Sequence, residues 1–198
     1  MVNVAIYLFD EVEVLDFAGP FEVFSTASRL QVRAGNPPGF RVFTVADRAR
    51  PVRARGGLMV SAEFTLADHP RPDLLVIPGG DVTGELGRAD VVEWIARTSA
   101  ASQLTASVCT GALLLAQAGL LNDTRATTHW EDLDQLGAFS GVRVESGMRW
   151  IDAGKIVTSA GISAGIDMSL HLVRRLADGE LAKRTARQMD FAWEDRGS

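Results

Sequence analysis

Residues 104–115, Leu-Thr-Ala-Ser-Val-Cys-Thr-Gly-Ala-Leu-Leu-Leu, change halfway from the pattern of a strand to the pattern of a helix. The run up to Val108 suits a buried strand, and the alanine and leucines from position 112 onward suit a helix. Cys109, the only cysteine in the chain, falls where the two patterns meet. Gly111 removes a Cβ where the turn is tightest. We therefore predict a sharp strand-to-helix corner that carries a cysteine.

A cysteine at such a corner is a candidate nucleophile. Its thiol would point toward the first free backbone N–H groups of the helix, and these groups favour the thiolate. Serine hydrolases present their nucleophile in the same way. Thr110 would add a backbone N–H and a hydroxyl for substrate or water, unless it is an ordinary threonine at a helix start. The alternative for Cys109 is a buried structural cysteine, because free cysteine is among the most buried residue types.

The composition is typical of a soluble globular protein, since 46% of the 198 residues are hydrophobic and 23% are charged. This length predicts a single domain over residues 1–198. The net charge is −5 and the arginines are dispersed, so we expect no nucleic-acid partner. The apolar segment 2–9 is too short to span a bilayer and follows no basic region, so we expect neither a membrane partner nor a signal peptide.

The sequence also carries no signal for a cofactor. Three scattered histidines and one cysteine show no metal-ligand spacing, so we expect no metal. The pairs Gly56-Gly57 and Gly79-Gly80 do not fit the spacing of a phosphate-binding loop. A single cysteine forbids an internal disulfide, and this fits a reducing cytoplasm.

Strand and helix patterns alternate along the chain. Strands are expected at 2–9, 41–45, 73–77, 104–108, 125–128, 142–145, 149–152 and 156–158, with one or two minor strands within 50–60. Helices are expected at 16–27, 88–101, 109–119, 130–136, 162–176 and 181–189. Pro20 should lie in the first turn of the first helix. The alternation predicts an α/β fold, a three-layer sandwich with a mainly parallel central sheet and helices on both faces.

Three of the apolar strands are followed by residues that could do chemistry. They are Asp16, the pair Gly79 and Gly80, and Cys109. Because ligands of parallel sheets bind beyond the carboxyl ends of the strands, we predict that these residues share one active site. Asp16 could transfer a proton, or it could be only a first-turn acid of its helix. The open backbone N–H groups of the two glycines could stabilise developing negative charge, although a tight turn alone would also need glycine.

Several other residues are also candidates for this site or for structural roles near it. His129 and Trp130 follow the strand at 125–128 and are possible pocket residues, with His129 either a polar neighbour of the sulfur or a structural histidine. His171 is expected to pack within its helix, and Asp167 to bond another buried polar group. Three further acids are expected to face solvent: Asp10, Glu11 and Glu13.

Six segments carry a more specific signal. They are Phe9-Asp10 with Leu-Asp-Phe-Ala-Gly-Pro-Phe-Glu-Val-Phe at 15–24, Leu-Val-Ile-Pro-Gly-Gly at 75–80, Val-Cys-Thr-Gly-Ala-Leu-Leu-Leu at 108–115, Gly-Leu-Leu at 119–121, Arg-Ala-Thr-Thr-His-Trp at 125–130, and residues 158–167. In this order they resemble the class I glutamine amidotransferase-like superfamily, in its PfpI-like branch. The resemblance spans nearly the whole chain and implies the same flavodoxin-like, three-layer fold.

Departures from relatives narrow the expected activity. Glutamine amidotransferases carry a His-x-Glu pair, whereas His171 is followed here by Leu-Val, so ammonia release from glutamine is disfavoured. PfpI-type peptidases place a histidine directly after the cysteine, where this chain has Thr110. Many PfpI-like relatives place a glutamate beside the cysteine, whereas this chain offers the shorter Asp16. An aspartate with Cys-Thr resembles the isonitrile hydratases of this branch.

The resemblance implies hydration of an isonitrile, R–N≡C, to an N-substituted formamide. Cys109 would be the nucleophile, Asp16 the acid and base, and Thr110 a holder of water or intermediate, with no cofactor. It also implies a homodimer. Two other classes stay open: a cysteine enzyme acting on glyoxal-type aldehydes, and a non-catalytic redox sensor or ligand-binding module. AraC-type regulators share several motifs but add a helix-turn-helix domain that these residues lack, so we do not expect a regulator.

Overall fold

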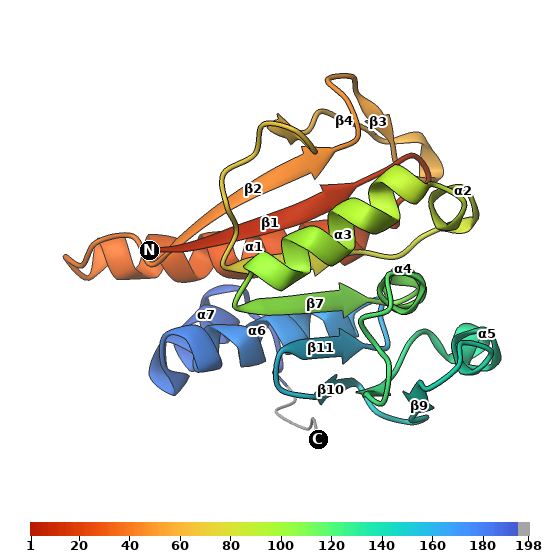
Figure 1. Ribbon diagram of the computed structural model, residues 1–198. Coiled ribbons are helices and arrows are strands. Elements are labelled where there is room, and N and C mark those ends of the chain that lie inside the picture. The colour runs from red at the N-terminus through yellow and green to blue at the C-terminus, as the bar shows by residue number, and fades with distance from the viewer. Residues whose placement is uncertain (194–198) are drawn as a thin grey trace.

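The computed structural model describes residues 1–193 and is built on a seven-stranded sheet (Figure 1). Its strands are β1 (Val2–Leu8), β2 (Phe40–Ala46), β5 (Phe64–Thr65), β6 (Leu74–Ile77), β7 (Leu104–Val108), β10 (Trp150–Asp152) and β11 (Ile156–Ser159). They lie in the order β10-β11-β7-β6-β1-β2-β5, and every neighbouring pair is parallel except β10 and β11. The mainly parallel central sheet predicted from the sequence is confirmed.

Helices cover both faces of this sheet. They are α1 (Val14–Arg33), α2 (Thr83–Leu86), α3 (Ala89–Ala101), α4 (Gly111–Gln117), α5 (Leu133–Gly137), α6 (Ala164–Leu176) and α7 (Gly179–Gln188), with short 3-10 helices η1 (Arg55–Gly57) and η2 (Trp130–Asp132). Helices α1, α6 and α7 pack on one another on one face, and α2, α3 and α4 pack together on the other (Figure 1). The three-layer architecture is therefore as predicted.

Two small sheets lie outside the central one. Strands β3 (Val52–Arg53) and β4 (Met59–Val60) form an antiparallel pair. Strands β8 (Arg125–Ala126) and β9 (Arg143–Val144) form a parallel pair. The strand predicted at 125–128 is thus shorter than expected, and the helix predicted at 130–136 is divided between η2 and α5.

The core follows from the apolar central strands. Residues 4–8 of β1 and all of β6 and β7 are buried, because helices cover both faces of a parallel sheet. Among residues 1–193 no helix is both long enough and apolar enough to cross a membrane.

One helix boundary differs from the prediction. Helix α1 begins at Val14, so Pro20 lies inside the helix and not in its first turn. An interior proline removes one backbone hydrogen bond and is usually unfavourable. Here Pro20 is buried, and α1 packs against β2, α6 and α7. Tertiary packing therefore outweighs the local preference from which the boundary was predicted.

Candidate active site

The predicted corner is present between β7 and α4. Cys109 has φ of 53°, the left-handed region, which a residue with a Cβ enters at a cost of about 1–2 kcal/mol. Gly111 is required just beyond it, because a Cβ at this position would lie 2.1 Å from the carbonyl oxygen of Ile77. The corner thus combines a strained cysteine backbone with a close backbone crossing.

Neighbouring elements hold this strained backbone in place. The Cys109 N–H donates to the carbonyl of Ser159 at 3.0 Å, and the Cys109 carbonyl accepts from the Thr128 hydroxyl at 2.8 Å. Gly161 passes so close that a Cβ there would lie 2.4 Å from the Cβ of Cys109. Residues following β11 and β8 therefore fix the direction of the thiol.

Asp16 lies in the first turn of α1 and reaches the same point. Its side chain is fully buried, and Oδ2 accepts a hydrogen bond from the Gly79 N–H at 3.0 Å. The Cys109 thiol is close enough to interact with the carboxyl group by hydrogen bonding. Within residues 1–193, Oδ1 makes no hydrogen bond of regular geometry. The sequence prediction that Asp16 and Cys109 meet is therefore correct in geometry.

Burial changes the proton affinity of both groups. It raises the pKa of Asp16 to about 7, and the hydrogen bond from Gly79 opposes this rise only in part. Burial, followed by the negative charge of Asp16, raises the pKa of Cys109 to about 12. The hydrogen bond from the Thr110 backbone to the sulfur acts in the opposite direction but is weaker.

The predicted preference for a thiolate is therefore wrong for the resting site. The helix N–H groups do favour the thiolate, but desolvation and the neighbouring carboxylate outweigh them. Near neutral pH the sulfur keeps its proton and Asp16 is close to half-ionised. The arrangement is that of a thiol facing its own base.

The two glycines differ from the prediction as well. The Gly79 N–H is occupied by Asp16, and the Gly80 N–H donates to Oγ1 of Thr110 at 2.9 Å. The Thr110 hydroxyl donates in turn to the Gly80 carbonyl at 2.9 Å. These N–H groups are therefore not open to a developing charge. They position the acid and the threonine instead.

The thiol opens into a pocket of about 470 Å³. Cys109 is only 7% exposed, yet it lines this pocket together with Thr110, Gly80 and His129. His129 directs Nδ1 toward the Asp132 carboxylate at 3.4 Å. Trp130 is 72% exposed and its ring lies 5.6 Å from that of His129. The structure therefore places His129 in the pocket wall and Trp130 next to it.

Sequence reasoning missed most of the charged wall of this pocket. The added lining residues are Glu13, Arg55, Asp81, Glu131, Asp132 and Ile162. Glu13 was expected in solvent, but it is only partly exposed and its carboxylate lies 3.6 Å from the Arg55 guanidinium. Acids in turns carry no local signal for a pocket, because segments that are far apart in the sequence must come together to form this wall.

The other polar candidates have structural partners elsewhere. His171 stacks on Trp150 with ring centroids 4.0 Å apart and hydrogen-bonds Asp152 at 2.6 Å. Buried Asp167 accepts from Arg149 at 2.9 Å. The packing roles expected for His171 and Asp167 are confirmed. Within residues 1–193 no group of three or more histidine, cysteine or acidic side chains is arranged to hold a metal ion.

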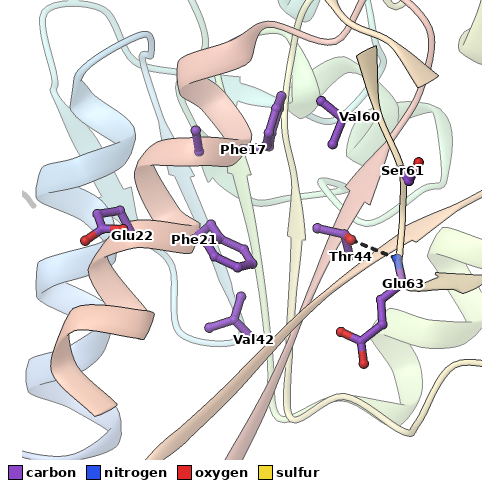
Figure 2. A pocket seen from close by; sticks show the side chains of 9 residues that line it. Phe17, Phe21, Glu22, Val42, Thr44, Val60, Ser61 and Glu63 are labelled. Carbon is purple, nitrogen blue, oxygen red and sulfur yellow. Dashed lines mark hydrogen bonds between the residues drawn. The ribbon is translucent and has the colours of Figure 1, made fainter. Parts of the chain in front are cut away.

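A second hollow of about 580 Å³ lies on another side of α1. Figure 2 shows Phe17 and Phe21 of α1 beside it, with Val42 and Thr44 of β2 opposite. The Thr44 hydroxyl accepts from the Glu63 N–H at 3.0 Å. This hollow is larger than the pocket of Cys109, but among residues 1–193 its lining holds no cysteine and no histidine.

Comparisons with known proteins identify relatives of this chain. The DJ-1/PfpI family matches residues 2–175. The chain is 32% identical to the isonitrile hydratase of Pseudomonas putida, over 96% of this chain and 79% of that protein. It is 28% identical to the HTH-type transcriptional regulator CdhR of Pseudomonas aeruginosa, over 88% of this chain but only 51% of the regulator. A crystal structure of a THiJ/PfpI family protein from Pseudomonas syringae superposes with a TM-score of 0.86, at 27% identity over 100% of this chain and 79% of that chain.

Proposed function

Because the chain belongs to the DJ-1/PfpI family, we propose that it uses Cys109 to hydrate isonitriles to N-substituted formamides without a cofactor. The observation that carries the proposal is the fully buried Asp16 next to Cys109, which itself lines a pocket. The 32% identity to an isonitrile hydratase supports the choice of substrate class. A pKa of about 7 suits Asp16 to give and take protons near neutral pH.

The first step joins the thiol to the isonitrile carbon. Asp16 as carboxylate takes the proton of the Cys109 thiol and passes it to the terminal carbon of R–N≡C. That carbon becomes electrophilic, and the sulfur lone pair forms the C–S bond. The product is a thioimidate, R–N=CH–S–Cys109, and Asp16 is again a carboxylate. Because the pKa of the thiol is raised, a free thiolate would be costly, so we propose that the proton leaves the sulfur as the C–S bond forms and no thiolate accumulates.

The second step adds water and releases the product. Asp16 takes a proton from water as the water oxygen bonds to the same carbon, and the nitrogen receives that proton. The C–S bond then breaks, its electron pair returns to sulfur, and the hydroxyl proton passes through Asp16 to the sulfur. This leaves R–NH–CHO and the free thiol. The atoms of one water molecule are thereby added to the isonitrile.

The surrounding residues position this pair. The Gly79 N–H would keep one carboxyl oxygen fixed, so that the other faces the reacting atoms. Thr110 is fixed by Gly80, and its backbone N–H points at the sulfur, where it would stabilise the thiolate that leaves in the last step. Thr110 would thus act mainly through its backbone.

The test is direct. Purified protein is mixed with cyclohexyl isocyanide, and N-cyclohexylformamide is followed with time. Cys109→Ala and Cys109→Ser should both reduce turnover to the uncatalysed rate, with circular dichroism confirming that each variant is folded. Turnover that survives both substitutions would refute covalent catalysis by Cys109.

Further measurements on the same protein separate the two other classes of function, the aldehyde enzymes and the redox sensors. Methylglyoxal is offered as a substrate, and turnover of it without isonitrile turnover would assign the chain to the aldehyde enzymes. A stable Cys109 sulfinate after mild peroxide, with neither substrate consumed, would favour a redox sensor. We also propose a homodimer in the cytoplasm, and sedimentation equilibrium of the purified chain tests the oligomeric state.

A further inference from the structure

The pocket of Cys109 has an unbalanced charge. Four carboxylates line it, those of Glu13, Asp81, Glu131 and Asp132, and we call this set the acidic entrance. Among residues 1–193, Arg55 is the only arginine or lysine in the lining. Counted over the acids and Arg55 alone, the wall therefore carries a net charge of −3.

The single arginine acts on more than one of these acids. The Arg55 guanidinium lies 3.6 Å from the Glu13 carboxylate, and its charge also contributes, after local hydrogen bonds, to lowering the pKa of Asp81. Asp132 and Glu131 both approach Nδ1 of His129, at 3.4 and 3.6 Å. The acids with no arginine or lysine partner in the lining described within residues 1–193 are therefore those on the η2 side of the pocket, Glu131 and Asp132.

Two further observations indicate that a ligand meets these charges. The Asp16 side chain is fully buried beside Cys109, and its Oδ1 atom makes no regular hydrogen bond within residues 1–193. Trp130 is 72% exposed immediately beside Glu131. Trp130 does not line the pocket itself, but an exposed indole next to carboxylates at the pocket edge can attract organic ammonium groups, through cation–π attraction and charge.

The negative charges of the acidic entrance act on the sulfur of Cys109. The carboxylate of Asp132 is among the groups that raise the pKa of Cys109, after burial and Asp16. Glu13 acts in the same direction on the pKa of Asp16. An anion that approached Cys109 would meet the same repulsion, because clefts lined by charges of one sign focus their field on an incoming ligand.

We propose that the acidic entrance selects substrates by charge, favouring isonitriles whose substituent carries an ammonium group and disfavouring those that carry a carboxylate. The inference rests on the proposed function for the reacting group, but the selection by charge concerns the access to Cys109 and is measurable without turnover. Neutral isonitriles are expected to fall between the two.

The single cysteine allows a direct test of access. Three methanethiosulfonate reagents form a mixed disulfide with a thiol and release methanesulfinate: the 2-aminoethyl reagent is cationic, the methyl reagent neutral and the 2-sulfonatoethyl reagent anionic. Their second-order rate constants with Cys109 are divided by those with 2-mercaptoethanol. At low ionic strength we expect the corrected cation-to-anion ratio to be at least about tenfold, in the range known for focused fields, and to shrink in high salt.

The variant Glu131→Gln combined with Asp81→Asn should reduce that ratio severalfold. Glu93→Gln is the matched control, because Glu93 is an exposed acid on α3 that does not line the pocket of Cys109. A corrected ratio within twofold of unity, or one that the double substitution leaves unchanged, would overturn the inference. No reaction with any reagent would overturn it too, since the entrance would then not lead to the sulfur.

A second arm separates this inference from the proposed function. The values of kcat/KM are compared for 3-(dimethylamino)propyl isocyanide, cyclohexyl isocyanide and isocyanoacetate. If labelling depends on charge but no isonitrile is hydrated, the proposed function fails and selection at the entrance stands. If all three are hydrated equally, the proposed function stands and the charge selection is wrong.

Discussion

Asp16 and Phe17 are consecutive residues of α1, yet they serve two different hollows. Asp16 is buried beside Cys109, which lines the pocket with the acidic entrance. Phe17 lines the larger, apolar hollow of Figure 2. Beside the smaller pocket, burial raises the pKa values of Asp16 and Cys109, whereas at the larger hollow a hydrogen bond from Thr26 lowers the pKa of Glu22. The comparison teaches that reactivity follows from where charge is desolvated, and volume alone does not indicate it.

The largest expected effect comes from comparing Asp16, beside the pocket of Cys109, with Glu22, an acid that lines the apolar hollow. Asp16→Asn should lower kcat for isonitrile hydration by about 100- to 10,000-fold, because it removes the group that carries the proton. Glu22→Gln is the matched control, an acid-to-amide change on the same helix beside the apolar hollow. Initial rates of formamide formation measure both. Equal losses in the two variants would remove the distinction between the hollows.

The same substitution should change how stability depends on pH. Since the pKa of Asp16 is raised to about 7 in the folded state, that state binds more protons than the unfolded chain between about pH 4 and 7. Wild-type stability is therefore lost across this window as the pH rises. Asp16→Asn should be more stable than the wild type above pH 7, by on the order of 2–4 kcal/mol, and no more stable below pH 4.

Urea denaturation at pH 4, 6 and 8 measures this difference. The sign is the sensitive part of the experiment, because loss of a buried polar contact would destabilise the variant at every pH. A variant that is less stable than the wild type at pH 8 would show that burial does not raise the pKa of Asp16 in the folded state.

The next effect concerns the backbone behind the sulfur. Gly161→Ala should lower the free energy of unfolding by about 2–3 kcal/mol, because Gly161 has φ of 65° and a Cβ there would collide with Cys109. Gly84→Ala is the control, since Gly84 lies in α2 with open space around its Cβ position. It should be neutral or stabilising by up to about 1 kcal/mol. Thermal denaturation compares the two variants.

The smallest effect belongs to the apolar hollow. Glu22→Gln weakens an ion pair with Arg29 at 2.8 Å, but both side chains are at least half exposed. Exposed pairs contribute at most about 1 kcal/mol, so the free energy of unfolding should fall by less than this amount. Chemical denaturation in low and high salt provides the measurement. A loss above about 2 kcal/mol would mean that this side of α1 is held more tightly than its exposure indicates.

Much of the site could be read from local patterns. The strand-to-helix change around Cys109, and the approach of Asp16 and Gly79 to it, follow from the rule that residues after parallel strands meet at one sheet edge. The predictions that failed concern the protonation of the sulfur and the availability of the glycine N–H groups. The thiolate predicted for Cys109 and the open N–H groups predicted for Gly79 and Gly80 both depend on neighbours in space, and those neighbours occupy or repel them.

The order of apolar strands and amphipathic helices was enough to determine the layered fold, because each pattern can bury its apolar side in only a few ways. It also determined which residue is the candidate nucleophile, since one cysteine stands at one sharp corner. Only the tertiary structure decided where the proton sits and which charges surround the sulfur. Burial and electrostatic interaction depend on distances between segments far apart in the chain, and no local pattern encodes those distances.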